Sequence, residues 1–179
     1  MNMKKFFLVI IFMLLNAFCF LFAQTETRYF IYEPSKGGGI SINPKGETNP
    51  ILGKGEAVLE LGGYNGHIPW HDDARVKPLQ KLIDEGILSK QRMKELAGKE
   101  PIQIISYFDE TGIVKYVRFW LPDGAKSLLT DEELYAICQA YKGVLYDLSH
   151  AEVERSETGS KTVFYCSDFF DIPFEDLRF

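Results

Sequence analysis

The chain has 179 residues, which is enough for one folded domain with a real core and too few for two comfortable ones. It carries 20 Lys and Arg against 25 Asp and Glu, a formal net charge of −5. This acidic balance, without a basic stripe in the sequence, disfavours nucleic acid and anionic membrane surfaces as partners.

The N-terminus, residues 1–23, has the pattern of a secretory signal peptide. Lys4 and Lys5 precede an apolar run over 6–22, and Ala23 stands where signal peptidase requires a small residue. We therefore expect cleavage before Gln24 and export to the periplasm or to the outside of the cell, with no membrane span left after cleavage.

The alternatives for this segment are a retained membrane anchor and a lipid anchor. The run over 6–22 is at the short limit for spanning a bilayer, and no basic stop-transfer flank follows it. A lipid anchor on Cys19 requires a small preceding residue, and Phe18 occupies that position. Both alternatives are weaker than cleavage.

Residues 24–76 are rich in glycine, with β-like runs at 28–33, 40–42 and 57–61. These runs predict short strands joined by turns. The glycines at 37–39 do not fit the phosphate-loop pattern G-x-x-x-x-G-K-[ST], so we expect them to form a turn.

Residues 77–98 are predicted to form two short helices. Pro78 suits a first helical position and Gly86 a helix end, while Ser89 can cap the second helix, which Gly98 closes. The segment "LQKLIDEGILSKQRMKELAG" resembles the short helical hairpin known as SHOCT. That resemblance implies a helical hairpin and no activity.

Residues 102–170 have the order strand, strand, helix, strand, strand. Two strands over 102–122 are joined by a turn ending in Gly112, and a helix follows that begins with a Thr130/Glu133 capping box and ends at Gly143. Extended segments at 144–155 and 161–170 complete the pattern.

The second strand of this part has two distinct faces, since side chains alternate along a strand. One face is apolar, and the other is aromatic and basic. The first is expected to hold Val117, Phe119 and Leu121, and the second Tyr116, Arg118 and Trp120.

Together these elements predict a single α+β domain over 24–179, with a mostly antiparallel sheet and two to three short helices packed on one face. The runs "FDETGIVKYVRF" and "LTDEEL" in this order are similar in topology to the C-terminal domain of TonB and to small PepSY-type exported domains. The resemblance implies an interaction module of the cell envelope. As a whole, the chain also resembles the small exported proteins of uncharacterised families common in Bacteroidetes.

After cleavage two cysteines remain, Cys138 in the predicted helix and Cys166 in the last predicted strand. Export to an oxidising compartment makes a disulfide between them worth considering. A helix packed on a sheet holds its Cα atoms about 10 Å from those of the sheet, beyond the reach of a disulfide. A bridge and two buried thiols therefore both stay open.

The stretch "GHIPWHDDA" at 66–74 is the best candidate for chemistry. His67, His71, Asp72 and Asp73 could gather around a metal or act as acid and base, as in a hydrolase. Pro69 between the two histidines makes the continuous helix of an H-E-x-x-H zinc site improbable. In the alternative reading the aspartates cap a short turn before the Pro78 helix.

The function expected from the sequence is a non-catalytic exported binding or interaction module of the cell envelope, with an unidentified protein or glycan ligand. We expect no cofactor, and the sequence contains neither a G-x-S-x-G elbow nor the flanking sequences of thiol proteases. The candidate binding residues are Tyr64, His67, Trp70 and His71. The alternative is a metal-dependent or acid/base hydrolase built on the His/Asp cluster.

The first prediction concerns Trp70, which we expect to anchor its segment in the core while His71 stays near the surface. Trp70→Ala should lower the free energy of unfolding by about 3 kcal/mol, and His71→Ala by less than about 1 kcal/mol. Chemical denaturation of both variants measures this. Parental stability of Trp70→Ala would mean that the indole is exposed.

Overall fold

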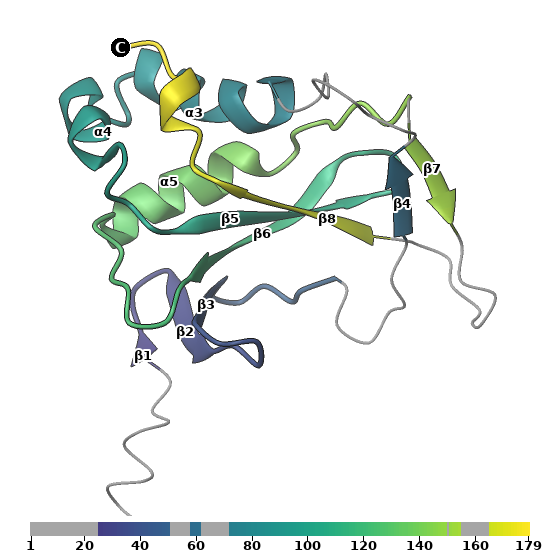
Figure 1. Ribbon diagram of the computed structural model, residues 1–179, viewed down its shortest axis with the longest axis horizontal. Helices are drawn as coiled ribbons and strands as arrows, with labels where there is room; N and C mark the ends of the chain where they lie inside the picture. The colour runs from purple at the N-terminus through teal and green to yellow at the C-terminus, as the bar shows by residue number, and fades with distance from the viewer. Residues whose placement is uncertain (1–24, 51–57, 62–71, 150, 155–164) are drawn as a thin grey trace, which may run out of the picture.

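The computed structural model describes residues 25–50, 58–61, 72–149, 151–154 and 165–179. It contains a six-stranded antiparallel sheet with the α-helices packed on one of its faces (Figure 1). The predicted α+β class is therefore confirmed.

The main sheet has the strand order β1-β2-β3-β6-β5-β8, and a separate two-stranded sheet pairs β4 with β7. Along the chain, the helical segments lie between β4 and β5, between β6 and β7, and after β8. The strands are β1 (Thr25–Glu26), β2 (Phe30–Pro34), β3 (Ile40–Pro44), β4 (Val58–Leu61), β5 (Gln103–Asp109), β6 (Val114–Leu121), β7 (Ala151–Glu154) and β8 (Tyr165–Asp171). The helical segments are η1 (Asp72–Val76, π-helix), α3 (Lys77–Asp84), α4 (Lys90–Leu96), α5 (Asp131–Tyr141) and η2 (Phe174–Asp176, 3-10).

The core lies between the sheet and the helical layer. The central strands β5 and β6 direct one set of apolar side chains toward α5, which meets them with its own buried stripe. Members of this core include Ile104, Val117, Phe119, Leu134 and Ile137, all of which are at most 1% exposed. Each such side chain contributes about 1.5–3 kcal/mol through removal from water.

The predicted division of β6 into two faces is confirmed. Val117, Phe119 and Leu121 belong to the core beneath the helices. Tyr116 and Trp120 pack instead in a second cluster, with Ile105 and Tyr107 of β5, on the opposite side of the sheet. We call this opposite side the outer face.

The glycines at 37–39 form the turn between β2 and β3, as predicted. Gly38 and Gly39 have φ of 92° and 73°, which disfavours residues with a Cβ atom. A Cβ on Gly39 would also lie 2.4 Å from the Leu121 carbonyl oxygen. The turn is fastened to the end of β6, since Asp123 accepts a hydrogen bond from Gly39 N at 2.6 Å and Trp120 Nε1 donates to Gly38 O at 3.1 Å.

The strand predicted at 144–155 is only partly formed. Leu145 makes a single bridge with Ile113, and Tyr146 N donates to Gly112 O at 2.9 Å. Tyr146 is 1% exposed and its ring stacks on Phe108, 4.5 Å between centroids, so the chain dips into the core here. Regular pairing begins again at β7, which joins β4 and leaves the main sheet. The predicted order of elements is confirmed as β5-β6-α5-β7-β8.

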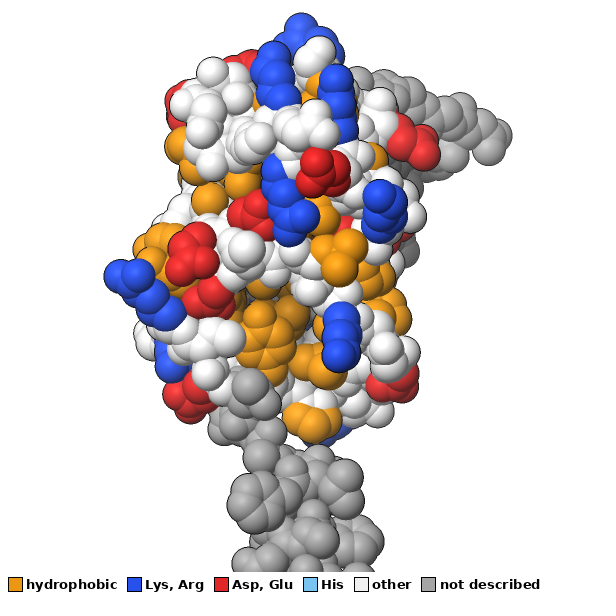
Figure 2. Space-filling model, turned by 90° about the vertical axis from the view of Figure 1, so that its left-hand side faces the viewer, with side chains coloured by type: hydrophobic (Ala, Val, Ile, Leu, Met, Phe, Trp, Pro, Cys, Tyr) orange, Lys and Arg blue, Asp and Glu red, His pale blue; other side chains and the backbone are white. Residues whose placement is uncertain are grey.

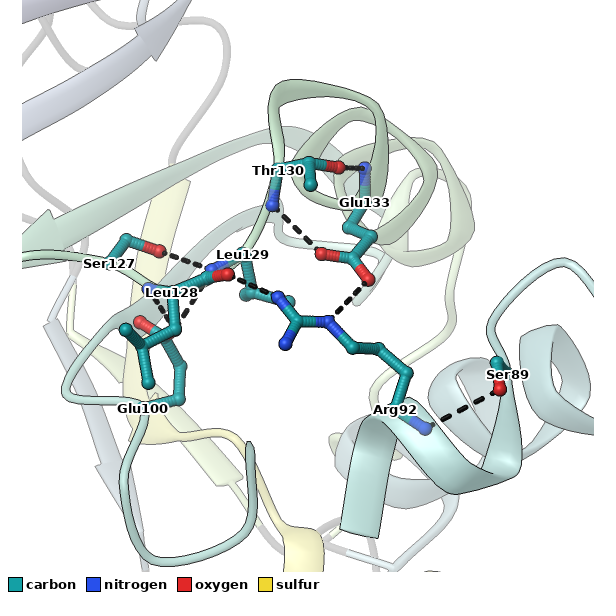
Figure 3. A network of polar contacts seen from close by, with 8 residues as sticks. All are labelled: Ser89, Arg92, Glu100, Ser127, Leu128, Leu129, Thr130 and Glu133. Carbon is teal, nitrogen blue, oxygen red and sulfur yellow. Dashed lines mark hydrogen bonds and ion pairs between the residues drawn. The ribbon is translucent and has the colours of Figure 1, made fainter. Parts of the chain in front are cut away.

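The predicted helical hairpin is also present as α3 and α4, and Arg92 connects it to α5 (Figure 3). Ser89 caps α4 by accepting from Arg92 N at 3.4 Å. The Arg92 side chain lies between the helices, where Nε donates to Glu133 Oε1 at 3.2 Å and Nη2 donates to the Leu128 carbonyl. A basic residue three positions after the cap therefore joins two helices.

Glu133 serves two helices at once. It completes the predicted capping box of α5, in which Thr130 N donates to Glu133 Oε2 at 2.8 Å and Glu133 N donates to Thr130 Oγ1 at 3.1 Å. Its other carboxylate oxygen accepts from Arg92. The packing of α4 on α5 thus depends on a residue that also starts α5.

We expect Glu133→Ala to lower the free energy of unfolding by about 1–2 kcal/mol, because it removes half of the capping box and a partly screened ion pair. Glu132→Ala is the matched control, since Glu132 is an exposed acid in the same turn. It should cost less than about 0.5 kcal/mol. Urea denaturation compares the two, and equal losses would contradict the role given to Glu133.

Candidate functional site

The outer face of the sheet carries a cleft of about 630 Å³. Its floor comes from β5 and β6, and its walls come from β2, β3 and the segment that follows β3. The side chains that define its chemistry are Glu33, Ser41, Asn43, Tyr107, Tyr116 and Arg118. Strand alternation explains their gathering, since each belongs to the outward-facing set of its own strand.

Two tyrosines and one arginine form the floor. The rings of Tyr107 and Tyr116 lie 5.7 Å apart with an interplanar angle of 58°. The guanidinium carbon of Arg118 lies 5.6 Å from the centroid of the Tyr107 ring, a cation–π contact. Tyr116 Oη donates to Asn43 Oδ1 at 3.4 Å. The floor is thus aromatic with polar groups at defined positions.

Arg118 is the most unusual member of this group. Its Nη1 donates to Ser41 Oγ at 3.1 Å, but its buried Nε has no hydrogen-bond acceptor within the described part of the chain. A buried donor left unsatisfied costs about 1–3 kcal/mol. Arg118 also makes no ion pair with any described residue. The cleft therefore contains a cation with unused hydrogen-bonding capacity.

The tyrosine beside Arg118 stays a neutral donor. Burial raises the pKa of Tyr116 well above 10.0, and the charge of Glu47 raises it further, while the charge of Arg118 lowers it. Burial is the largest of these effects. Tyr116 thus offers the cleft a phenol rather than a phenolate at neutral pH.

Two carboxylates stand in the walls, and both already have partners. Glu33 Oε2 accepts from Asn43 Nδ2 at 3.1 Å. Glu47 forms an ion pair with Lys142. Lys36 is a second, exposed base in the lining. The cleft carries acidic and basic side chains together, and Arg118 is the positively charged residue at its floor.

A second polar cluster lies between the sheet and the helices. Asp168 of β8 accepts from both Arg75 Nε, at 2.7 Å, and Arg75 Nη2, and also from Tyr146 Oη at 2.9 Å. Tyr141 Oη donates to the Arg75 carbonyl. Tyr141, Tyr146 and Asp168 are at most 7% exposed, which leaves no room for a ligand. The cluster fastens η1 to the sheet.

The predicted binding residues Tyr64, His67, Trp70 and His71 lie outside the described residues. Asp72 and Asp73 open η1, and only their backbone is described. Within the described ranges, no group of three or more His, Cys, Asp or Glu side chains could hold a metal ion. The His/Asp cluster is therefore left as a sequence-based hypothesis.

Cys138 and Cys166 are thiols in the structure, so the bridge left open by the sequence is not formed. Cys138 Sγ lies 3.7 Å from the Val117 carbonyl oxygen of β6, whereas Cys166 on β8 pairs with Phe108 of β5. Since β5 separates β6 from β8, the strand that Cys138 contacts lies about 10 Å from the strand that carries Cys166, which is beyond the reach of a disulfide. Burial raises the pKa of the Cys138 thiol to about 12, against a lowering effect of Lys142.

Figure 2 shows one other side of the molecule, where several hydrophobic side chains lie together in the lower half. Acidic and basic side chains are mixed over the rest of this end of the molecule, which carries α4 and β1. The exposed large hydrophobic residues come from separate elements, as isolated ones do on ordinary surfaces. They are Ile87, Leu128, Tyr135, Leu145, Phe169 and Phe179. Among the described residues, no helix is long and apolar enough to cross a membrane.

The alternation of residues predicts that Tyr116 and Arg118 share one face of a strand, but it does not identify the cleft. Its walls come from residues far away in sequence, such as Ser41, which lies 77 positions from its partner Arg118. The usable signal was an arginine between two aromatic residues on the polar face of a strand. This pattern identifies a binding cleft only when the residues of the cleft walls are also known.

The comparisons with known proteins support the fold. No protein-family model matches the sequence, and no curated protein matches it. Among solved structures, the crystal structure of a DUF5043 family protein from Bacteroides uniformis ATCC 8492 is similar, with a TM-score of 0.51 and 15% sequence identity. The match covers 85% of this chain and 91% of that chain. At this identity the similarity concerns the fold alone.

The buried tyrosines predict a loss of stability in alkali. Burial, followed by the charge of Asp168, raises the pKa of Tyr141 and of Tyr146 well above 10.0. Above pH 10 the unfolded chain loses these protons while the folded protein keeps them. The stability present below pH 10 is therefore lost as the pH rises toward the folded pKa, by up to about 1.4 kcal/mol per pH unit for each tyrosine.

Tyr141→Phe should make this decline shallower, although it also removes the hydrogen bond to Arg75 O and lowers stability at neutral pH by about 1 kcal/mol. Urea denaturation between pH of about 8 and about 11 measures the slope. Tyr135→Phe, which changes an exposed tyrosine of the same helix, is the control. Identical slopes for the parent and Tyr141→Phe would contradict the prediction.

Proposed function

We propose that this protein is an exported, non-catalytic binding module of the cell envelope, and that its glycan or protein ligand occupies the cleft of the outer face. The observation that carries the proposal is the cleft itself, about 630 Å³ in volume with Tyr107, Tyr116 and Arg118 at its floor. Clefts that combine aromatic rings with a few oriented polar groups are the usual form of small-ligand sites.

The chemistry of the floor supports a polar ligand that contains a ring or a planar group. Tyr107 and Tyr116 offer aromatic surface, while Ser41, Asn43 and Arg118 offer hydroxyl, amide and guanidinium groups. Sugars and peptide segments both present such alternating apolar and hydrogen-bonding surfaces. The rigid strands that carry these side chains hold them in place before binding, which lowers the entropic cost of association.

The location belongs to the same proposal and is supported by the sequence pattern of residues 1–23, with its basic start, apolar run and Ala23. An exported module of this kind would meet glycans and proteins of the envelope rather than nucleic acid. The acidic net charge supports that choice of partner.

The test is a titration of the isotope-labelled mature protein with neutral and acidic oligosaccharides and with short peptides, followed by backbone NMR. We expect saturable shifts that concentrate at Ser41, Asn43 and the floor of the cleft. Thr48→Trp, which places an indole at an exposed position of the lining, should weaken binding by about tenfold or more. Gln139→Trp, on the exposed side of α5, is the matched control and should bind as the parent does.

Shifts confined to other surfaces would contradict the proposed site. Steady conversion of an added compound into a product, followed in the same NMR samples, would contradict the non-catalytic role. Equal binding by parent and Thr48→Trp, with shifts outside the cleft, would place the ligand elsewhere on the molecule.

A further inference from the structure

The partly buried arginines of the described chain differ in whether they have a carboxylate partner. Arg75 and Arg92 each have a carboxylate partner, Asp168 and Glu133. Arg118 is also partly buried but has only the neutral Ser41 hydroxyl and the ring of Tyr107 beside it. Because a partly desolvated guanidinium is most stable against a carboxylate, the cleft lacks the partner that this residue type prefers.

We infer that Arg118 anchors a carboxylate group of the ligand in the outer-face cleft, an inference that rests on the proposed function. The guanidinium has five N–H donors in a planar fork, and only the bond from Nη1 to Ser41 is made with another residue described in the structure. The buried Nε lacks an acceptor. Arg118 lines the cleft, so a carboxylate bound there would accept charge-assisted hydrogen bonds from the terminal N–H groups of the guanidinium.

The surroundings of Arg118 keep the guanidinium in position for such a contact. The Tyr107 ring lies against it, 5.6 Å from the guanidinium carbon to the ring centroid, and Ser41 holds one of its terminal nitrogens. Tyr116 next to it stays neutral and can donate its own proton. An incoming carboxylate would therefore meet a fixed cation rather than a flexible surface chain, which reduces the entropy lost on binding.

The charges in the walls restrict the ligand further. Glu33 and Glu47 give the walls two negative charges that a bound ligand would face, and Lys36 in the same lining is exposed. A polyanion such as a phosphorylated or sulfated chain would meet these carboxylates as well as Arg118. The lining thus favours a single carboxylate on an otherwise neutral, polar ligand. Uronic acid sugars and the C-terminal carboxylate of a peptide share this chemistry.

The experiment compares pairs of probes in which a carboxylate is replaced by a neutral group. The pairs are acetate and acetamide, glucuronate and glucose, and a short N-acetylated glycine peptide with a free or an amidated C-terminus. Ionic strength is held constant with chloride, so that a general anion effect is the same in every sample. The readouts are the Nε–Hε resonance of Arg118 and the dissociation constant.

We expect each carboxylate probe to shift this resonance and at least one larger carboxylate to bind about tenfold to hundredfold more tightly than its neutral counterpart. The larger pair with the stronger preference identifies the source as a sugar or a peptide. Arg118→Met should abolish the preference, and Arg118→Lys should lose most of it because an ammonium lacks the planar fork. Lys126→Met, which removes an exposed lysine outside the lining, should keep it within about twofold.

Thermal unfolding of each variant verifies folding, and the comparison of paired probes on the parent protein needs no variant at all. Equal affinities for charged and neutral probes in the cleft would overturn the carboxylate inference while supporting the cleft as a binding site. Shifts from carboxylate probes that leave the Arg118 resonance and the cleft unchanged would overturn both. Equal losses in Arg118→Met and Lys126→Met would show an effect of general charge and overturn the assignment to Arg118.

Discussion

The hairpin of β5 and β6 is the centre of the main sheet, and side-chain alternation along it decides both layers of the protein. Val117 and Phe119 face the helices and are withdrawn from water, so Tyr116 and Arg118 between and beside them must face the other way. The register of the hairpin is fixed by the hydrophobic core because a slip by one residue would bury Arg118 among apolar groups. The cleft thus inherits its geometry from the packing of the core on the other side of the sheet.

The helical layer uses charged residues differently from the outer face. Arg75 reaches a carboxylate on β8, and Arg92 reaches a carboxylate on α5, so each cation ties two distant segments together. Removing one partner of such a pair leaves a partly buried charge without compensation, which destabilises the fold. On the outer face Arg118 connects β6 to β3 only through a neutral hydroxyl. The same residue type is structural in one layer and available for contact in the other.

Much of the fold could be predicted because local patterns decide it. The capping box of Thr130 and Glu133, the alternation in β6 and the turn glycines at 37–39 act over a few residues, and each appears as expected. The segment after Gly143 was predicted less well because Tyr146 is drawn inward by Phe108 and Asp168, contacts that no local pattern contains. The cleft was missed for the same reason. Its floor and walls come from strands that are neighbours in space and far apart in sequence.

The Arg75–Asp168 pair has a further consequence for β8, which stands at the edge of the main sheet. An edge strand exposes backbone groups that can pair with another chain, and a charge pointing inward from such a strand is one way proteins prevent this. Asp168 points to the core side, where it accepts hydrogen bonds from Arg75 and Tyr146. A β8 strand paired with a neighbouring molecule in a partly unfolded state would carry an uncompensated carboxylate into an apolar layer. The Asp168 carboxylate therefore opposes intermolecular pairing of this edge, and the ion pair with Arg75 lets the native fold accommodate the same charge.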